Sequence, residues 1–236
     1  MFGLANATGE VKALPAPELR ATDPEAYWLK IRKEQFFLPE WRAFLNNGSL
    51  GVAPRPVVAA VTEFLENAAS LSSDEYPRWG YETLDAERTE MAEFLGCKQD
   101  ELAFTHCATE GISTVAMGLD LKAGDEIITT EQDYPRMITT WKQRERREGV
   151  KVKYLKLPSP VTSQDELYRL FEQAITPRTR VLHFCHLTNL TGLIFPVARI
   201  CRMARERGVE AVVDGAHAYA QMAFRHSDLD CDYYGV

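Results

Sequence analysis

Four short segments combine residue types that could do chemistry, and each follows a run that is typical of a β-strand. They are THCATEGIS (105–113), EQDYPR (131–136), HLTNLTG (186–192) and DGAHA (214–218). Because open α/β sheets bind ligands beyond the carboxyl ends of their strands, these segments are expected to meet at one edge of a sheet. The sequence therefore predicts a candidate site that is assembled from several weak signals.

The first segment has the features of an anion site. In THCATEGIS a predicted strand is followed by small residues and then by a helix that begins near Thr109. The free N–H groups of a helix start, the helix dipole and a threonine hydroxyl can bind an anion. Thr109 alone fits a simple helix cap better, with Glu110 favourably placed in the first turn. The chain has no Walker pattern and no G-x-G-x-x-G fingerprint, so a nucleotide is not indicated and a nicotinamide-dependent oxidoreductase is disfavoured.

The last segment carries a carboxylate at a predicted strand end. Asp214 follows a run of apolar residues in VVDGAHA. Asp-Gly is also a common turn, but a buried carboxylate needs a donor or a cationic partner. His217 could pack beside Asp214, although a lone histidine there is more often structural. Asn189 and Tyr134 also have simpler explanations as turn residues.

Two histidines near the end of a predicted strand could suggest a metal site. His183 and His186 flank Cys185. Residues three apart on a strand face opposite sides of the sheet, so core packing or a strand-end hydrogen bond is favoured over a zinc site.

Taken together, the four segments offer an anion site, an aromatic ring, an amide, a carboxylate and an imidazole at the predicted rim. This set suits a flat, cationic heteroaromatic ring that bears a phosphate.

Strands and helices alternate along most of the chain. Predicted strands cover 101–105, 125–130, 151–157, 179–185, 209–214 and 231–236, and the helices between them cover 109–119, 135–148, 163–175 and 196–208. This alternation with short connections is typical of an α/β domain with a mainly parallel sheet. Further upstream, helical patterns occupy 23–37, 56–71 and 82–95 after a weakly patterned lead-in.

The composition is that of an ordinary globular protein, with 236 residues, 45% hydrophobic residues and a net charge of −7. The one dense basic run, Lys142 to Arg147, alternates with glutamates and is interpreted as a solvated helix face, so no nucleic-acid partner is predicted. Five cysteines without a CxxC pair favour free thiols in a reducing cytosol. No secretory signal pattern and no apolar stretch near the ~20 residues of a membrane span are found.

The segments FLNNGSLG, CATEGIS, EQDYP…W, HLTNLTG and VVDGAHA occur in an order and spacing that resemble one family. From about Phe44 to Val236 the chain resembles the class V aminotransferase family of fold-type I pyridoxal-phosphate (PLP) enzymes, and within it the isopenicillin N epimerase-like group. The resemblance implies a three-layer αβα fold with a mainly parallel sheet. Residues 1–80 would form an N-terminal arm and a helical segment of the small domain or dimer region, and residues 81–236 the PLP-binding large domain.

The resemblance also implies a role for each residue at the predicted rim. Asp214 would pair with the pyridinium nitrogen, and Tyr134 would stack on the ring in a place that histidine holds in the desulfurase branch. Asn189, helped by His217, would hydrogen-bond near the ring hydroxyl, and the start of the 109–119 helix would bind the phosphate. The residues expected to bind PLP are therefore Ala108, Thr109, Tyr134, Asn189, Asp214 and His217.

The catalytic lysine of such an enzyme is not among these residues. In relatives the strand that matches DYYGV is followed within a few residues by a Ser-x-His-Lys-like turn, whose lysine forms the Schiff base with PLP and moves the α-proton. This lysine is expected just beyond Val236. The resemblance further implies an antiparallel strand between 101–105 and 231–235, without which these two strands would face a gap with unpaired backbone groups.

The expected function is therefore that of a PLP-dependent enzyme acting at the α-carbon of an amino acid, with epimerase, lyase, desulfurase or transaminase chemistry. We expect the chain to be the N-terminal part of a longer, homodimeric, cytoplasmic enzyme and to be inactive by itself; sedimentation of the whole protein would test the dimer. The alternative is a truncated or degenerate, non-catalytic paralogue that serves as a dimerisation module or binds PLP loosely.

Overall fold

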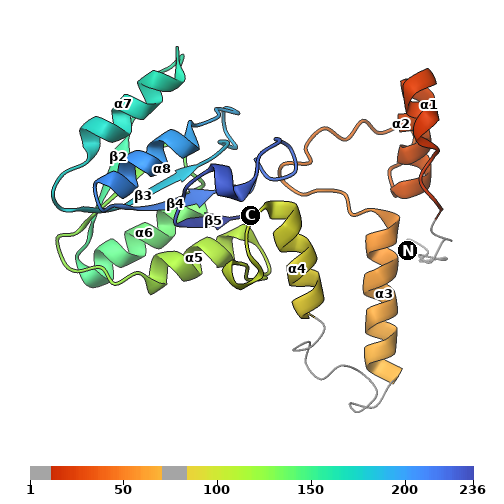
Figure 1. Ribbon diagram of the computed structural model, residues 1–236, viewed down its shortest axis with the longest axis horizontal. Coiled ribbons are helices and arrows are strands. Elements are labelled where there is room, and N and C mark those ends of the chain that lie inside the picture. Colours follow the sequence, from red (N-terminus) through yellow and green to blue (C-terminus); the bar gives the residue numbers. More distant parts are fainter. Residues whose placement is uncertain (1–11, 71–83) are drawn as a thin grey trace. The chain divides into compact units, whose positions relative to one another are not determined.

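The computed structural model describes residues 12–70 and 84–236 (Figure 1). Its contacts divide the chain into two units, Met1–Thr83 and Leu84–Val236, which are described separately. No helix within the described residues is long and apolar enough to cross a membrane. All five cysteines are free thiols.

The first unit is helical, with α1 (Pro17–Thr22), α2 (Pro24–Gln35) and α3 (Arg55–Ser70). The side chain of Asp23 caps α2 by accepting a hydrogen bond from the N–H of Ala26 at 3.0 Å, and a proline occupies the first helical position. Arg55, at the start of α3, donates to the Phe36 carbonyl (3.2 Å) and lies over the Phe37 ring. The two predicted helices in this range are confirmed.

The second unit is built on a five-stranded sheet in the order β2-β1-β3-β4-β5, in which every pair is parallel. The strands are β1 (Glu126–Thr130), β2 (Lys151–Leu155), β3 (Thr179–Cys185), β4 (Glu210–Asp214) and β5 (Tyr233–Gly235). The helices are α4 (Leu84–Leu95), α5 (Ala108–Gly118), α6 (Pro135–Glu148), α7 (Gln164–Ala174) and α8 (Val197–Glu206), with short 3₁₀ turns η2 (Gln99–Glu101) and η3 (His226–Asp228). Each helix that was predicted in this range is present.

Two apolar cores lie on opposite faces of the sheet (Figure 1). On one face, residues of α5 and α6 such as Ile112 and Trp141 pack against Ile127 of β1. On the other face, residues of α7 and α8 such as Phe171 pack against Phe184 of β3. Successive side chains along each strand point to opposite faces of the sheet and so contribute to both cores. This is expected of a parallel sheet that is covered by helices on both faces. The predicted three-layer αβα arrangement is confirmed.

The strand predicted at 101–105 is wrong. Residues 99–101 form the η2 turn, and Leu102 is extended but, like 103–105, pairs with no strand among the described residues. A groove of about 430 Å³ lies beside β5, lined among others by Leu102, Ile112 and Tyr233. A β-strand forms only where a neighbouring strand accepts and donates its backbone hydrogen bonds. Residues 102–105 have no such neighbour among the described residues, although their sequence is typical of a strand.

The basic run on α6 was also misinterpreted in part. Most of its side chains are exposed, but Arg144 is almost fully buried. Its guanidinium donates to the carbonyls of Ala116 (2.6 Å) and Leu119 (2.9 Å) at the end of α5, and pairs with the Glu148 carboxylate. Arg144 therefore satisfies carbonyl groups that a helix end leaves open, and it ties α5 to α6.

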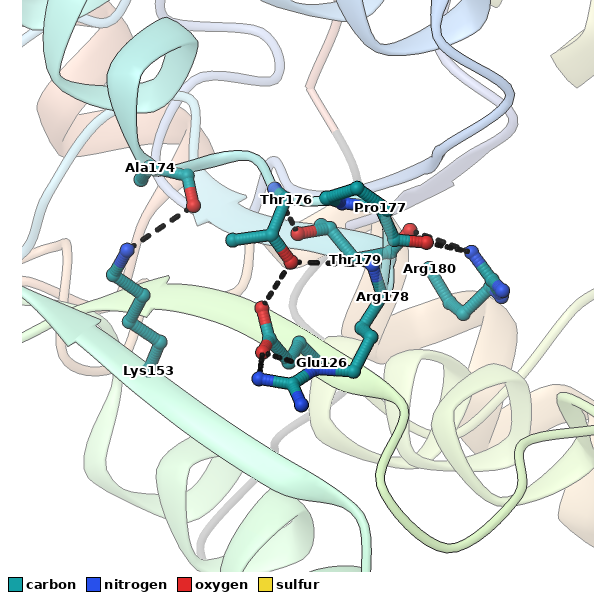
Figure 2. Close-up of polar contacts among 8 residues, drawn as sticks. All are labelled: Glu126, Lys153, Ala174, Thr176, Pro177, Arg178, Thr179 and Arg180. Carbon is teal, nitrogen blue, oxygen red and sulfur yellow. Dashed lines mark hydrogen bonds and ion pairs between the residues drawn. The ribbon is translucent and has the colours of Figure 1, made fainter.

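Glu126 begins β1 at the amino edge of the sheet and holds the loop that leads into β3 (Figure 2). Its carboxylate accepts hydrogen bonds from the Thr176 hydroxyl at 2.6 Å and from Arg178 Nε at 3.0 Å. Its own N–H donates to the Arg178 carbonyl at 2.9 Å, where the register between β1 and β3 shifts. The Thr176 hydroxyl, then the Arg178 and Lys153 charges, hold the pKa of Glu126 below its usual range, against the opposing effect of burial.

We expect Glu126→Gln to destabilise the Leu84–Val236 unit by about 1–3 kcal/mol at pH 7, because charge-assisted bonds to a buried group are lost. A lowered carboxyl pKa adds stability above the unfolded value of about 4.5, and this stability is lost as the pH falls through the folded pKa. Urea unfolding should therefore separate variant and wild type at pH 7 and bring them together in acid. Glu131→Gln, at the other end of β1, is the matched control. An equal difference at both pH values would contradict this account.

Candidate functional site

The carboxyl ends of β1, β3 and β4 lie side by side, because these strands are parallel neighbours. Hydrogen bonds join the segments that leave them. The N–H of Cys185 donates to Asp133 Oδ1 (2.8 Å), and the N–H of His186 donates to the Asp214 carbonyl (2.7 Å). Helix α5 packs against β4 and β5 and runs antiparallel to the strands, so it starts at this same edge (Figure 1). The four segments that were predicted to meet are therefore on one rim.

Asp214 is the last residue of β4 and is buried. One carboxylate oxygen accepts the N–H of Ala216 at 3.1 Å, and the other makes no hydrogen bond among the described residues. Burial raises the pKa of Asp214, and the Asp133 carboxylate adds to this rise, while the Ala216 N–H and the imidazoles of His183 and His217 oppose it. Asp214 closes its own turn, as its interpretation as a turn residue predicts. A poorly solvated carboxylate oxygen such as this one favours a cationic partner.

The start of α5 is open. The N-cap is Cys107, with no side-chain cap, and Thr109 is the second helical residue, so its interpretation as a helix cap is wrong. Among the described residues, the N–H groups of Ala108, Thr109 and Glu110 and the Thr109 hydroxyl have no hydrogen-bond partner. The Glu110 carboxylate turns back to accept the His106 N–H (2.7 Å) and lies 2.8 Å from His106 Nδ1. Three free N–H groups at a helix start favour an anion.

The remaining predicted residues lie on the adjoining loops. Tyr134 directly precedes α6 and is 38% exposed. Asn189 is exposed in a turn closed by a hydrogen bond from Gly192 N–H to the Thr188 carbonyl, with Gly192 at a φ of 69°. His217 is half-buried in the turn after β4, close enough to lower the pKa of the neighbouring aspartate. None of the Tyr134, Asn189 and His217 side chains forms a hydrogen bond within the described part of the chain, so all three are available to a ligand.

Comparison with known proteins identifies the family. The family model for aminotransferase class-V matches residues 44–236. The chain belongs to the aminotransferase class-V family. Isopenicillin N epimerase from Amycolatopsis lactamdurans is 38% identical over 210 residues, which cover 88% of this chain and 52% of that protein. The chain thus spans about half the length of the curated class-V relatives it matches.

Solved class-V structures confirm the fold. The cysteine desulfurase CsdA from Escherichia coli is 27% identical with a TM-score of 0.73, over 87% of this chain and 53% of that one. A C-DES variant with glycine covalently linked to its PLP cofactor is 23% identical with a TM-score of 0.72, over 83% of this chain and 52% of that one. The sheet and its helices are those of fold-type I PLP enzymes.

The two histidines of this class-V chain face opposite sides of the sheet, as predicted. The His183 ring packs beside Trp141 of α6, with ring centroids 5.9 Å apart. His186 is bonded through Nδ1 to the Tyr234 hydroxyl (2.9 Å), among residues that border the other core. Within residues 12–70 and 84–236 no three side chains are grouped so as to hold a metal ion.

Asp133 was not among the predicted site residues, and it is buried at the rim. Its carboxylate accepts from the Thr129 hydroxyl and the Thr130 N–H, both at 2.6 Å, as well as from Cys185 N–H. Its position directly before Tyr134 and three residues after the end of a buried strand was the available signal. Asp133 thus ties the tyrosine-bearing turn to the ends of β1 and β3.

Proposed function

We propose that the chain forms the PLP-binding part of a class V enzyme that acts at the α-carbon of an amino acid. The observation that carries the proposal is the buried Asp214 carboxylate, one oxygen of which has no hydrogen bond among the described residues. It shares its rim with the open start of α5. These two features match the two ends of PLP, a protonated ring nitrogen and a phosphate. The residues present therefore fit the cofactor.

Bound PLP supplies an electron sink that stabilises negative charge at the substrate's α-carbon. The role of Asp214 is to keep the ring nitrogen protonated, since an ionised carboxylate in a poorly solvated place favours a positive partner. Tyr134 offers an exposed ring face for stacking. Asn189 and His217 carry free polar groups for the ring hydroxyl. Ala108 and Thr109 offer N–H groups and a hydroxyl to the phosphate.

An amino acid with a proton at its α-carbon is the substrate class that we propose. Support comes from the 38% identity with an isopenicillin N epimerase and from the likeness to a cysteine desulfurase. Both names point to α-amino acid chemistry. The first relative is the more similar in sequence, so we favour proton transfer at the α-carbon over cleavage of a carbon–sulfur bond.

The phosphate role can be tested by removing single donors at the start of α5. Ala108 is the first helical residue and Cys107 before it is extended, so Ala108→Pro should keep the helix while deleting one N–H. Thr109→Val deletes the hydroxyl. Each is expected to weaken PLP binding about five- to tenfold, the effect of about 1 kcal/mol or slightly more.

The measurement is the PLP dissociation constant from equilibrium dialysis, with inorganic phosphate as competitor. Thr114→Val is the matched control, because Thr114 lies on the same helix and its hydroxyl donates to the Glu110 carbonyl, away from the helix start. PLP affinity and phosphate competition that stay at wild-type values in both test variants would contradict the assignment of the phosphate site.

A further inference from the structure

Asp133, Thr129 and His183 form a buried polar network near Asp214, and the proposed function does not use it. Asp133 is 1% exposed, yet no lysine or arginine approaches it among the described residues. Three hydrogen bonds hold its carboxylate, from the Thr129 hydroxyl, the Thr130 N–H and the Cys185 N–H. A buried carboxylate without a cation is costly, and a network of this kind affects charged groups nearby.

The network extends to a buried histidine. Thr129 Oγ1 lies 2.6 Å from Asp133 and 3.4 Å from His183 Nδ1. Because an ionised carboxylate only accepts, the threonine proton goes to Asp133, and the threonine oxygen is left to accept the proton of Nδ1. This geometry assigns a proton to Nδ1 of His183.

His183 Nε2 has no hydrogen-bond partner among the described residues, although the side chain is completely buried. Trp141 Nε1, on the ring that packs beside it, also has none within the same residues. Buried polar atoms are normally satisfied, so the unpaired Nε2 sets this imidazole apart from the other buried polar groups of the sheet. The surroundings are apolar on the helix side, where Met137 and Trp141 of α6 and Ile112 of α5 cover this face.

His183 and Asp214 lie on one face of the sheet. In the parallel pairing of β3 with β4, His183 is opposite Val212 and Cys185 is opposite Asp214. Side chains at paired positions point to the same side, as do side chains two residues apart. The titratable groups near Asp214 are Asp133, His183, Cys185 and His217, together with Tyr234 of β5.

We propose that Asp133 and His183 are positioning residues that set, with opposite effects, the charge of the Asp214 carboxylate. The proposal rests on the proposed function in one respect, since this charge matters because it holds the proton on the bound ring nitrogen. Asp133 opposes ionisation of Asp214 and His183 favours it. Asp133 also anchors the turn that carries Tyr134, the proposed stacking partner of the ring.

The two residues act on the pKa of Asp214 in opposite directions. The Asp133 carboxylate raises it by like-charge repulsion, and the His183 imidazole lowers it. Burial is the largest cause of the raised pKa, and it is common to both variants considered next. Damage to packing alone would move the Asp214 pKa in the same direction in both.

The experiment is a pH titration of the Asp214 side-chain carboxyl by ¹³C NMR, with aspartate labelled, on the whole 236-residue chain without PLP. The resonance is assigned with Asp214→Asn. Asp133→Asn is expected to lower the pKa of Asp214. His183→Asn is expected to raise it, because asparagine keeps a donor near the place of Nδ1 and loses the imidazole. The double variant should lie between the two.

Trp141→Phe is the matched control, since it alters the ring beside His183 without changing a charge, and it should leave the Asp214 titration unchanged. Circular dichroism verifies that each variant is folded. Shifts in the same direction in Asp133→Asn and His183→Asn, or no shift in either, would overturn the proposal. Because the titration needs no cofactor, a failure here is separate from a failure to bind PLP, which would count against the proposed function instead.

Discussion

Replacement of Asp214 with asparagine is expected to lower the PLP-dependent turnover of the proposed enzyme by ~10²–10³-fold, the size of effect seen when one preorganised electrostatic partner is removed. The amide keeps an oxygen for the Ala216 N–H, so the turn after β4 is retained. It cannot carry the negative charge that favours a protonated ring nitrogen. The loss is therefore one of electrostatics and not of shape.

The same substitution should leave the chain as stable at neutral pH, or more stable. Burial raises the pKa of Asp214 above its ordinary value of 3.8, so the folded state binds the proton more tightly than the unfolded state does. Such a carboxyl costs stability as the pH rises from the unfolded pKa through the folded pKa. Asparagine removes this cost. Thermal unfolding at pH 7 and pH 4 measures it, and the gain of the variant should be larger at pH 7.

Asp232→Asn is the matched control for this prediction. Asp232 also accepts one backbone N–H, from Ala211 at 2.8 Å, but it precedes β5 at the opposite edge of the sheet. Its replacement should leave turnover and PLP affinity unchanged. Equal losses of turnover in Asp214→Asn and Asp232→Asn, or a marked loss of stability in Asp214→Asn, would show that Asp214 is mainly structural.

Much of the fold was predictable because local patterns and tertiary structure agree in it. β1, β3 and β4 are short apolar runs between turn residues, and the helices between them begin and end where caps, prolines and glycines occur, such as Gly149 at a φ of 78° after α6. The rim followed from parallel strand order alone, since neighbouring parallel strands end at one edge.

The failures arise where long-range partners decide the outcome. The residues 101–105 have strand-like sequence, but a ladder depends on a neighbour that local pattern does not reveal. Arg144 looks like its exposed neighbours on α6, and only the position of the α5 carbonyls shows why it is buried. Asp133 and His183 lie 50 residues apart in sequence and meet only through Thr129. Charge coupling of this kind is set by distances across the sheet.

The 236-residue chain by itself is expected to show no turnover of amino acids with added PLP. None of the lysines of the chain lies in the segment directly after β1, β3 or β4, where the candidate site is. The nine lysines are Lys12, Lys30, Lys33, Lys98, Lys122, Lys142, Lys151, Lys153 and Lys156. Moving the α-proton requires a base over the α-carbon, and a positioned general base contributes ~10²–10⁴-fold. Asp214 is committed to the ring nitrogen in the proposed site, and His217 lies beside it.

The test is to add PLP to the chain, reduce with borohydride, digest and map any phosphopyridoxyl group by mass spectrometry. Scattered, substoichiometric labelling of exposed lysines is expected, with no change when Asp214→Asn is used in place of the wild type. Of the nine, Lys156 is the one that follows a strand at the carboxyl edge, directly after β2, and it is exposed. Stoichiometric labelling of Lys156 alone, abolished in Lys156→Arg and accompanied by turnover, would move the catalytic centre from the ends of β3 and β4 to the outer strand of the sheet. Because β1 separates β2 from β3, such a centre would leave Asp214 without access to the ring nitrogen, and both proposals for that residue would fall together.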